Sequence, residues 1–130
     1  MNPISPNIKT GTVGELLVQL RLLQFDVQAA PPLKDSGNDL IAVCGGCFRA
    51  VQVKTTTGEV FNISNLPDHY NILAVVSLAG ENQNICLDAS KVFLIERERV
   101  DEVSRRIDSL AEFELSASRI KSLFTDHDES

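Results

Sequence analysis

Three polar side chains interrupt two apolar segments of this chain, and together they could hold a metal ion beside a phosphate. Asp39 precedes the apolar run 40–43, and Gln52 and Lys54 alternate with valines in the run 51–55. Residues two apart share one face of a strand, so Gln52 and Lys54 should point the same way. A polar group in a buried strand costs free energy unless it is paired or coordinates something, so the pattern indicates a function. A carboxylate, an amide carbonyl and an ammonium group at one sheet edge suit a divalent cation and a scissile phosphate.

The elements that must position these groups are two adjacent strands joined by a tight turn. Gly45-Gly46 separates the two runs, and pairing across this turn brings Asp39 toward the end of the second strand. Cys44 and Cys47 flank the turn, and such a pair can also bind zinc or perform redox chemistry. A structural zinc site would want a second pair, which the chain lacks, so we interpret both cysteines as small apolar residues of a hairpin. A cysteine-based redox or zinc protein is the third functional alternative.

A helix is expected before these strands. Thr10 or Thr12 can cap its start, and it should end near Gln24, because the sequence changes to strand-like alternation at 25–29. The residues expected on its buried stripe are Val13, Leu16, Leu17, Leu20 and Leu23.

Further strands and a second helix are expected in the rest of the chain. The run 59–64 alternates as an edge strand does, and 72–78 is apolar on both faces, as in the middle of a covered sheet. Shorter strand-like runs lie at 85–87 and 92–95. Helical spacing from Val100 onward predicts a second long helix, on the evidence of Val103, Ile107 and Leu110. This order of elements predicts an α/β sandwich with a mixed sheet.

Length and composition predict a single globular domain over residues 1–130. Hydrophobic residues make up 43% of the chain and charged residues 23%, which is ordinary for a folded domain with its own core. No apolar run approaches the roughly 20 residues that span a bilayer, so we expect no membrane association. The segment 1–6 lacks the regions of a secretory signal, and a cytoplasmic location is the default expectation.

The net charge of −6 argues against tight binding of nucleic acid, but the charge is unevenly distributed. Five Lys and Arg residues stand against four acids up to Thr56, which leaves +1 there and −7 in the remainder. The acidity therefore belongs to the second half of the chain. Any binding to nucleic acid should be weak and sensitive to salt, or should need a partner.

Several short motifs follow one another along the chain. They are Gly11-Thr12-Val13-Gly14-Glu15, Asn38-Asp39-Leu40-Ile41, Gln52-Val53-Lys54-Thr55, and Tyr70 before the run 72–78. Their order resembles that of the PD-(D/E)XK, or restriction-endonuclease-like, nuclease superfamily. The nearest likeness is to the branch of Holliday-junction resolvases and group I intron-associated endonucleases, over about residues 10–96. The region of about 100–124, expected to be helical, is not diagnostic.

The resemblance implies a three-layer sandwich, in which a central mixed sheet is flanked by helices, and an endonuclease that cleaves DNA with Mg²⁺ or Mn²⁺. By analogy Asp39 is the principal metal ligand, helped by Gln52, by the backbone carbonyl of Val53 and by Glu15 from the first helix. Lys54 would orient or deprotonate the attacking water and balance charge on the phosphate.

The resemblance and the local sequence also suggest residues that contact DNA and a second subunit. Lys34 and Arg49 could contact phosphates beside the site without reading sequence, and Thr55 belongs to the same motif. A nuclease that cuts two strands suits a homodimer. We expect the apolar stripe of the C-terminal helix to lie in the core, but its excess could instead pack on a second subunit. The residues of this excess are Ile120, Leu123 and Phe124.

Two departures from the family pattern keep an alternative open. Asn38 replaces a proline, which is a mild change, whereas Gln52 replaces a carboxylate. An amide oxygen can coordinate Mg²⁺ but brings no charge, so metal affinity should fall and a single ion is favoured over two. The alternative is a non-catalytic module on the same fold that binds nucleic acid or a protein.

Overall fold

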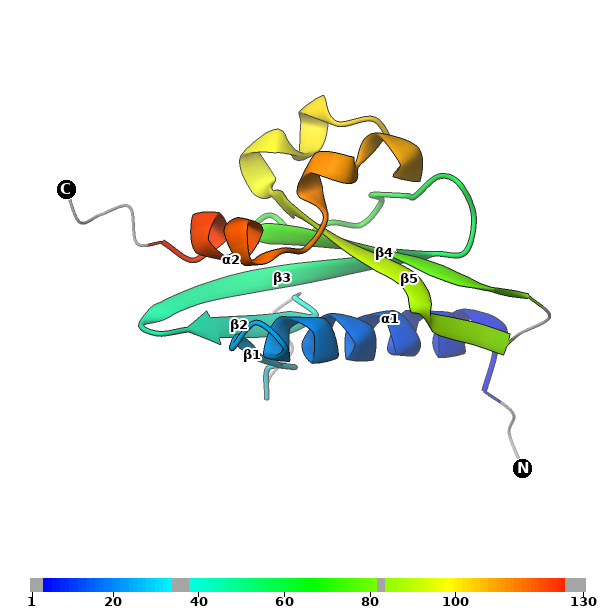
Figure 1. Ribbon diagram of the computed structural model, residues 1–130, viewed down its shortest axis with the longest axis horizontal. Helices are drawn as coiled ribbons and strands as arrows, with labels where there is room; N and C mark the ends of the chain where they lie inside the picture. Colours follow the sequence, from blue (N-terminus) through cyan, green and yellow to red (C-terminus); the bar gives the residue numbers. More distant parts are fainter. Residues whose placement is uncertain (1–3, 34–37, 82–83, 126–130) are drawn as a thin grey trace.

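A curled five-stranded mixed sheet with a long N-terminal helix forms the described part of the molecule (Figure 1). The computed structural model describes residues 4–33, 38–81 and 84–125, so Lys34, a predicted DNA contact, lies outside the described residues. The strands follow one another in chain order across the sheet, and β3 and β4 are the parallel pair. Their bounds are β1 Gln28–Ala30, β2 Leu40–Cys44, β3 Cys47–Thr56, β4 Ile72–Glu81 and β5 Asn84–Glu96. The predicted α/β class with a mixed sheet is confirmed.

The predicted hairpin is present, and it fixes the register on which the site depends. β2 and β3 are antiparallel, Cys44 pairs with Cys47, and Gly45 has the positive φ of 61° that a two-residue turn requires. Both cysteines are free thiols. β2 begins at Leu40 opposite Val51, whereas β3 continues to Thr56, so the second half of β3 runs past the end of its partner.

The first helix, α1 (Pro6–Leu23), begins earlier than predicted. Ser5 is its N-cap, with the Ser5 hydroxyl accepting from the Ile8 amide, and Pro6 occupies the first turn, where its missing N–H costs nothing. The predicted caps Thr10 and Thr12 are therefore wrong, while the helix ends before Gln24 as predicted.

The predicted buried stripe of α1 is confirmed in part. Leu17 is buried and Val13 packs against the core, as predicted, whereas Leu16, Leu20 and Leu23 are more than half exposed. The other buried residues of α1 are Gly14, Val18 and Leu22. The helix is apolar on two sides, so periodicity alone did not determine which side meets the sheet. The small residue Gly14 determines it, because it allows α1 to approach β3 closely.

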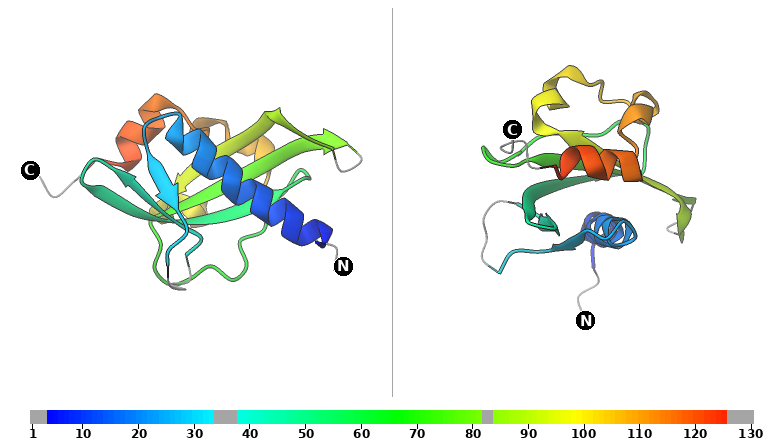
Figure 2. Two further views of the ribbon diagram at one scale, coloured as in Figure 1. Left: turned by 90° about the horizontal axis from the view of Figure 1, so that it is seen from below. Right: turned by 60° about the vertical axis from the view of Figure 1, so that its left-hand side comes forward.

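The sheet face away from α1 has its own core cluster, which short turns cover in place of the predicted long helix (Figure 2). In the described residues after β5 the chain forms three 3-10 helices, η1 (Arg97–Glu102), η2 (Ile107–Ser109) and η3 (Ala111–Phe113), and then α2 (Ala117–Leu123). Val100, Leu110 and Phe113 from these turns are buried against Leu73, Val75, Phe93 and Ile95 of β4 and β5. The helical spacing seen in the sequence was real, but separate 3-10 turns satisfy it.

Two other expectations differ from the structure. The run 59–64 is not a strand, because only Val60 forms a bridge, to Arg106. The apolar side chains of the last segment are buried in the main core, at 7% exposure for Ile120 and Leu123 and 9% for Phe124, so the predicted dimer contact through them is wrong. None of the described helices is long and apolar enough to cross a membrane.

Candidate active site

Asp39 directly precedes β2, at the point where β3 runs past its partner strand. Its Oδ2 accepts a hydrogen bond from the Val53 amide at 2.8 Å, which is the bond that a longer β2 would otherwise make. Within a strand the N–H and C=O of one residue face the same edge, so the Val53 carbonyl faces the Asp39 side as well. The start of β2 at Leu40 thus leaves one edge of β3 open, and the Asp39 carboxylate and the Val53 carbonyl lie along that edge.

Glu15 reaches the same edge from α1. A side chain at the preceding Gly14 would meet Thr55 of β3, because a Cβ built there lies 1.9 Å from the Thr55 Oγ1. Only glycine therefore permits this closeness of α1 and β3, and it brings Glu15 against Asp39. Partial burial, the negative charge of Asp39 and a hydrogen bond with Asp39 all raise the pKa of Glu15 above its ordinary value.

Gln52 is held in a fixed orientation by a relay of side chains. It is only 5% exposed, and its amide nitrogen donates to the Asn38 Oδ1 at 3.3 Å. Asn38 in turn donates to the backbone carbonyl of His69 at 3.0 Å. Asn38, which the sequence indicated only as a departure from the family pattern, is thus a positioning residue for Gln52.

Lys54 is two residues further along β3. Its Nζ donates to the backbone carbonyl of Ser64 at 2.7 Å, so the loop between β3 and β4 holds the ammonium group at the side of the site. Gln52 and Lys54 line one cleft, as the alternation along the strand predicts.

The cleft that contains these groups is open and has a volume of about 520 Å³. Glu15, Asp39, Gln52, Val53 and Lys54 all line it, and so does Thr55, a predicted DNA contact. Gly11, which also lines the cleft, belongs to the motif that the family resemblance selected. Sequence reasoning assigned no site role to the rest of the wall, because polar residues in a helix or a loop have no distinctive spacing. These additional residues are Asn7, Thr10 and Asn65.

Arg49, the other predicted DNA contact inside the described residues, is at the opposite end of β3 and does not line the cleft. Its guanidinium donates to the backbone carbonyls of Phe48, Leu123 and Thr125, at 2.9, 3.0 and 3.1 Å. These bonds tie the end of α2 to the hairpin, which is a structural role.

The donor atoms in the cleft suit a hard cation. Carboxylate, amide and backbone oxygens are the ligands that Mg²⁺ and Mn²⁺ prefer. A cation between the facing carboxyl groups of Glu15 and Asp39 would offset their mutual repulsion. In the described ranges no three or more His, Cys, Asp or Glu side chains are grouped so that they could hold a metal ion, so a metal here would complete its shell with amide, carbonyl and water oxygens. The residues present therefore fit one divalent ion.

Comparison with known proteins supports the fold. No protein-family model matches the chain, and no curated protein sequence matches it either. Among solved structures, a bacterial homing endonuclease, I-Ssp6803I, superimposes with a TM-score of 0.59 at 14% sequence identity, over 92% of this chain and 91% of that one. At this identity the match shows the fold alone, which is restriction-endonuclease-like.

Proposed function

We propose that this protein is a metal-dependent DNA endonuclease that hydrolyses phosphodiester bonds in the cleft beside β3. One observation carries the proposal: Glu15 from α1 and Asp39 from the start of β2 face each other in a cleft that also contains Gln52 and Lys54. The likeness to a homing endonuclease in fold supports the same reading.

In this proposal Asp39 and Glu15 bind one Mg²⁺ or Mn²⁺ together with the amide oxygen of Gln52 and the carbonyl of Val53. The bound ion would supply Lewis-acid stabilisation and a lowered pKa for its water. Asn38 keeps the Gln52 amide in place, and the Val53 amide fixes the Asp39 carboxylate, so the ligands are preorganised on stiff elements.

Lys54 acts on the phosphate and the attacking water. A cation fixed on a strand stabilises negative charge that develops on the phosphoryl oxygens without reorganising during the reaction. Its bond to the Ser64 carbonyl restrains the flexible side chain and keeps the ammonium at the cleft. Thr55, Asn7 and Thr10 supply polar groups beside it that suit the neighbouring backbone of a DNA strand.

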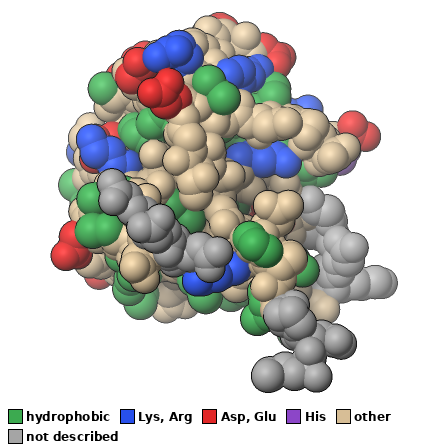
Figure 3. Space-filling view, turned by 90° about the vertical axis from the view of Figure 1, so that its right-hand side faces the viewer, with side chains coloured by type: hydrophobic (Ala, Val, Ile, Leu, Met, Phe, Trp, Pro, Cys, Tyr) green, Lys and Arg blue, Asp and Glu red, His purple; other side chains and the backbone are tan. Residues whose placement is uncertain are grey.

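The surface around the cleft is compatible with DNA in spite of the net charge of −6. Figure 3 views the end of the molecule at which α1 begins; there Lys and Arg side chains surround a largely uncharged centre, and acidic side chains lie toward the rim. The cleft itself contains the carboxyl groups of Glu15 and Asp39, so a phosphate would meet local repulsion there until a cation is bound. Binding to DNA should be weak, because few cations are available to neutralise phosphates.

A second candidate is a non-catalytic module that binds nucleic acid or a protein on the same fold. Gln52 favours it, since the position provides an amide where the family resemblance leads one to expect a carboxylate. Retention of Asp39 and Lys54 in one cleft opposes it.

The deciding experiment is a cleavage assay with purified protein, Mg²⁺ or Mn²⁺, and supercoiled, linear, single-stranded and four-way-junction DNA. Lys54→Ala should lose at least about 100-fold in turnover, the usual loss when a charge-stabilising group is removed, while still binding Mn²⁺ in a calorimetric titration. Asp39→Ala should lose both cleavage and Mn²⁺ binding.

The controls separate the two candidates. Arg49→Ala removes a cation from the same strand outside the cleft and should cleave at the rate of the unaltered protein once folding is verified. Full activity of Lys54→Ala would contradict the mechanism. Absence of cleavage and of Mn²⁺ binding in the unaltered protein would favour the non-catalytic module.

A further inference from the structure

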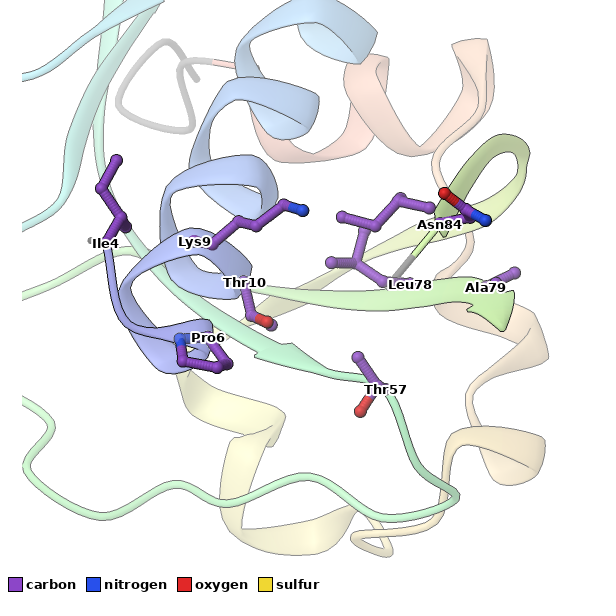
Figure 4. A pocket seen from close by; sticks show the side chains of 10 residues that line it. Ile4, Pro6, Lys9, Thr10, Thr57, Leu78, Ala79 and Asn84 are labelled. Carbon is purple, nitrogen blue, oxygen red and sulfur yellow. The ribbon is translucent and has the colours of Figure 1, made fainter. Parts of the chain in front are cut away.

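A second cavity adjoins the cleft and has no place in the proposed hydrolysis. It has a volume of about 380 Å³ and lies between the start of α1 and the hairpin that joins β4 to β5 (Figure 4). Thr10 lines both the cleft and this cavity, so the two share a wall in the first turns of α1. A strand of DNA held in the cleft would pass the mouth of the cavity as it leaves.

The cavity combines apolar walls with polar groups at its border. Leu78, Ile85 and Ile4 provide apolar surface, and Leu78 is fixed, being only 4% exposed. Lys9 extends from α1 toward Leu78 across the cavity, and the Asn84 side chain lies on the other side (Figure 4). None of the lining residues that the structure describes is acidic.

The wall formed by β4 and β5 is preformed. Gly80 has φ +147°, a region that other residues rarely adopt, and a Cβ there would lie 2.0 Å from the backbone carbonyl oxygen of Asn84. The two strands therefore approach as closely as their backbones allow at the edge of the cavity. A ligand would enter a shaped space rather than create one.

This combination matches a nucleobase attached to its phosphate. A base has two apolar faces, polar atoms on its edge and a negative charge one sugar away, and proteins hold unstacked bases against apolar side chains with polar groups at the edge. Asn84 carries both a donor and an acceptor for a base edge, and Lys9 carries the cation for the phosphate.

We infer that the cavity beside Lys9 takes an unpaired nucleobase of the DNA strand that the cleft holds, so that the preferred substrate has an unpaired nucleotide next to the cut. The inference rests on the proposed function and narrows its substrate class to DNA with an unpaired nucleotide, such as a flap or a bulge. Pulling a base out of a perfect duplex costs a few kcal/mol, so a nucleotide that is already unpaired binds more tightly.

The test measures binding without metal, so that it is independent of cleavage. Two dye-labelled oligonucleotide duplexes of matched sequence, one perfect and one with a single unpaired adenine, are titrated in EDTA and followed by fluorescence anisotropy. The unaltered protein should prefer the bulged duplex by about tenfold, the size of one base-stacking contact. Replacing the bulged adenine by 2-aminopurine should give a rise in its fluorescence on binding, because the base leaves its stack.

Two exposed positions allow the cavity to be altered without disturbing the core. Thr57→Trp places a large side chain at the cavity wall and should abolish the preference, and Lys9→Ala should reduce it several-fold. The matched controls are Thr12→Trp on the exposed side of α1 and Lys121→Ala on α2, neither of which lines the cleft or the cavity, and both should keep the full preference.

The outcomes separate this inference from the proposed function. Equal affinity for the two duplexes, or a preference that survives in Thr57→Trp, overturns the inference even when metal-dependent cleavage is found. No affinity for either duplex, together with no cleavage in Mg²⁺ or Mn²⁺, overturns both. A preference that is lost in Thr57→Trp and kept in Thr12→Trp supports the inference.

Discussion

Two glutamates of this molecule are half-buried beside a charged neighbour, and the neighbours have opposite signs. Glu96, at the end of β5, meets Arg119 of α2, with Oε1 2.7 Å from the guanidinium nitrogen. Glu15, on α1, meets the carboxyl group of Asp39. The first is an ion pair that joins α2 to the sheet, and the second is a pair of acids at the edge of a cleft.

The pKa values of the two glutamates move in opposite directions for this reason. Burial alone would raise the pKa of Glu96, but the hydrogen bond and the charge of Arg119 outweigh it and lower the pKa. Burial also raises the pKa of Glu15, and there Asp39 adds to the rise. The Glu96 pair stabilises the fold, whereas burial and the charge of Asp39 disfavour the ionised form of Glu15. In the proposed function, the acid pair that costs free energy is the one that would bind the cation.

The largest expected effect is on the free energy of unfolding, and it tests the stabilising pair of Glu96 and Arg119. Arg119→Met should lower the free energy of unfolding by about 3 kcal/mol, because it leaves the half-buried Glu96 without its partner. It also removes a guanidinium that lies 5.3 Å from the centre of the Phe113 ring. Urea unfolding followed by circular dichroism measures the change.

The control for Arg119 is an exposed ion pair. Arg106 and Asp108 approach within 3.1 Å, but both side chains are more than half exposed, so Arg106→Met should leave stability unchanged. Equal losses of unfolding free energy in the two variants would show that the Glu96–Arg119 pair stabilises the protein no more than an exposed ion pair does.

The next effect tests what brings the two acids together. Gly14→Ala should destabilise the protein by about 2 kcal/mol through overpacking against Thr55, and it should weaken Mn²⁺ binding by moving Glu15 away from Asp39. Gly11→Ala is the matched control in the same helix, because nothing lies within 4 Å of a Cβ there, and it should be neutral or stabilising.

A second-site change distinguishes geometry from general damage. Adding Thr55→Ala to Gly14→Ala removes the hydroxyl that the new Cβ meets and should restore part of the Mn²⁺ affinity. Mn²⁺ affinity that is unchanged in Gly14→Ala would show that α1 does not set the position of Glu15.

Local signals made part of this fold predictable from sequence. The Gly-Gly turn with apolar runs on both sides predicted the β2–β3 hairpin, and the doubly apolar run 72–78 predicted a central strand; both are present. The hairpin register alone brings Asp39 close to Gln52. The long helix expected from Val100 is absent because apolar spacing does not distinguish one helix from successive 3-10 turns.

The rest of the site depends on contacts that leave no local trace. Asn38 orients Gln52 through one hydrogen bond and is itself held by a second one to the His69 carbonyl, and His69 is 31 positions away from Asn38 in the sequence. The meeting of Glu15 with Asp39 depends on how closely α1 approaches β3, which Gly14 and Thr55 decide. The family resemblance suggested Glu15, but periodicity could not, since apolar spacing indicates only the residues that pack in the core.

A smaller effect on stability and on Mn²⁺ affinity is expected when a third acid is added beside Glu15 and Asp39. Gln52→Glu should lower stability without metal by about 1 kcal/mol, since the new charge is buried among acids, and should raise Mn²⁺ affinity by about tenfold. Calorimetric titration gives the affinity, and the melting temperature with and without Mn²⁺ gives the linkage. Gln19→Glu, on α1 outside the cleft, is the control and should change neither quantity. An unchanged Mn²⁺ affinity in Gln52→Glu would exclude position 52 from the metal shell.

The smallest effect is on pH dependence, and it has an opposite sign for the two glutamates. The ordinary pKa of a glutamate is 4.5, and folding raises the pKa of Glu15. As the pH rises from 4.5 through the raised pKa, the protein becomes less stable, because the folded state holds the proton more tightly than the unfolded state does. Glu96, with its lowered pKa, instead loses stability as the pH falls below 4.5. Glu15→Gln should therefore remove the loss of stability as the pH rises above 4.5. Near pH 7 in EDTA it should stabilise the protein by about 0.5 kcal/mol, the size of a like-charge repulsion. Mn²⁺ should flatten the same slope in the unaltered protein, because a cation between two carboxylates replaces the shared proton. If the loss of stability above pH 4.5 persists in Glu15→Gln, another group causes it, and the Glu15–Asp39 pair does not destabilise the folded protein as proposed.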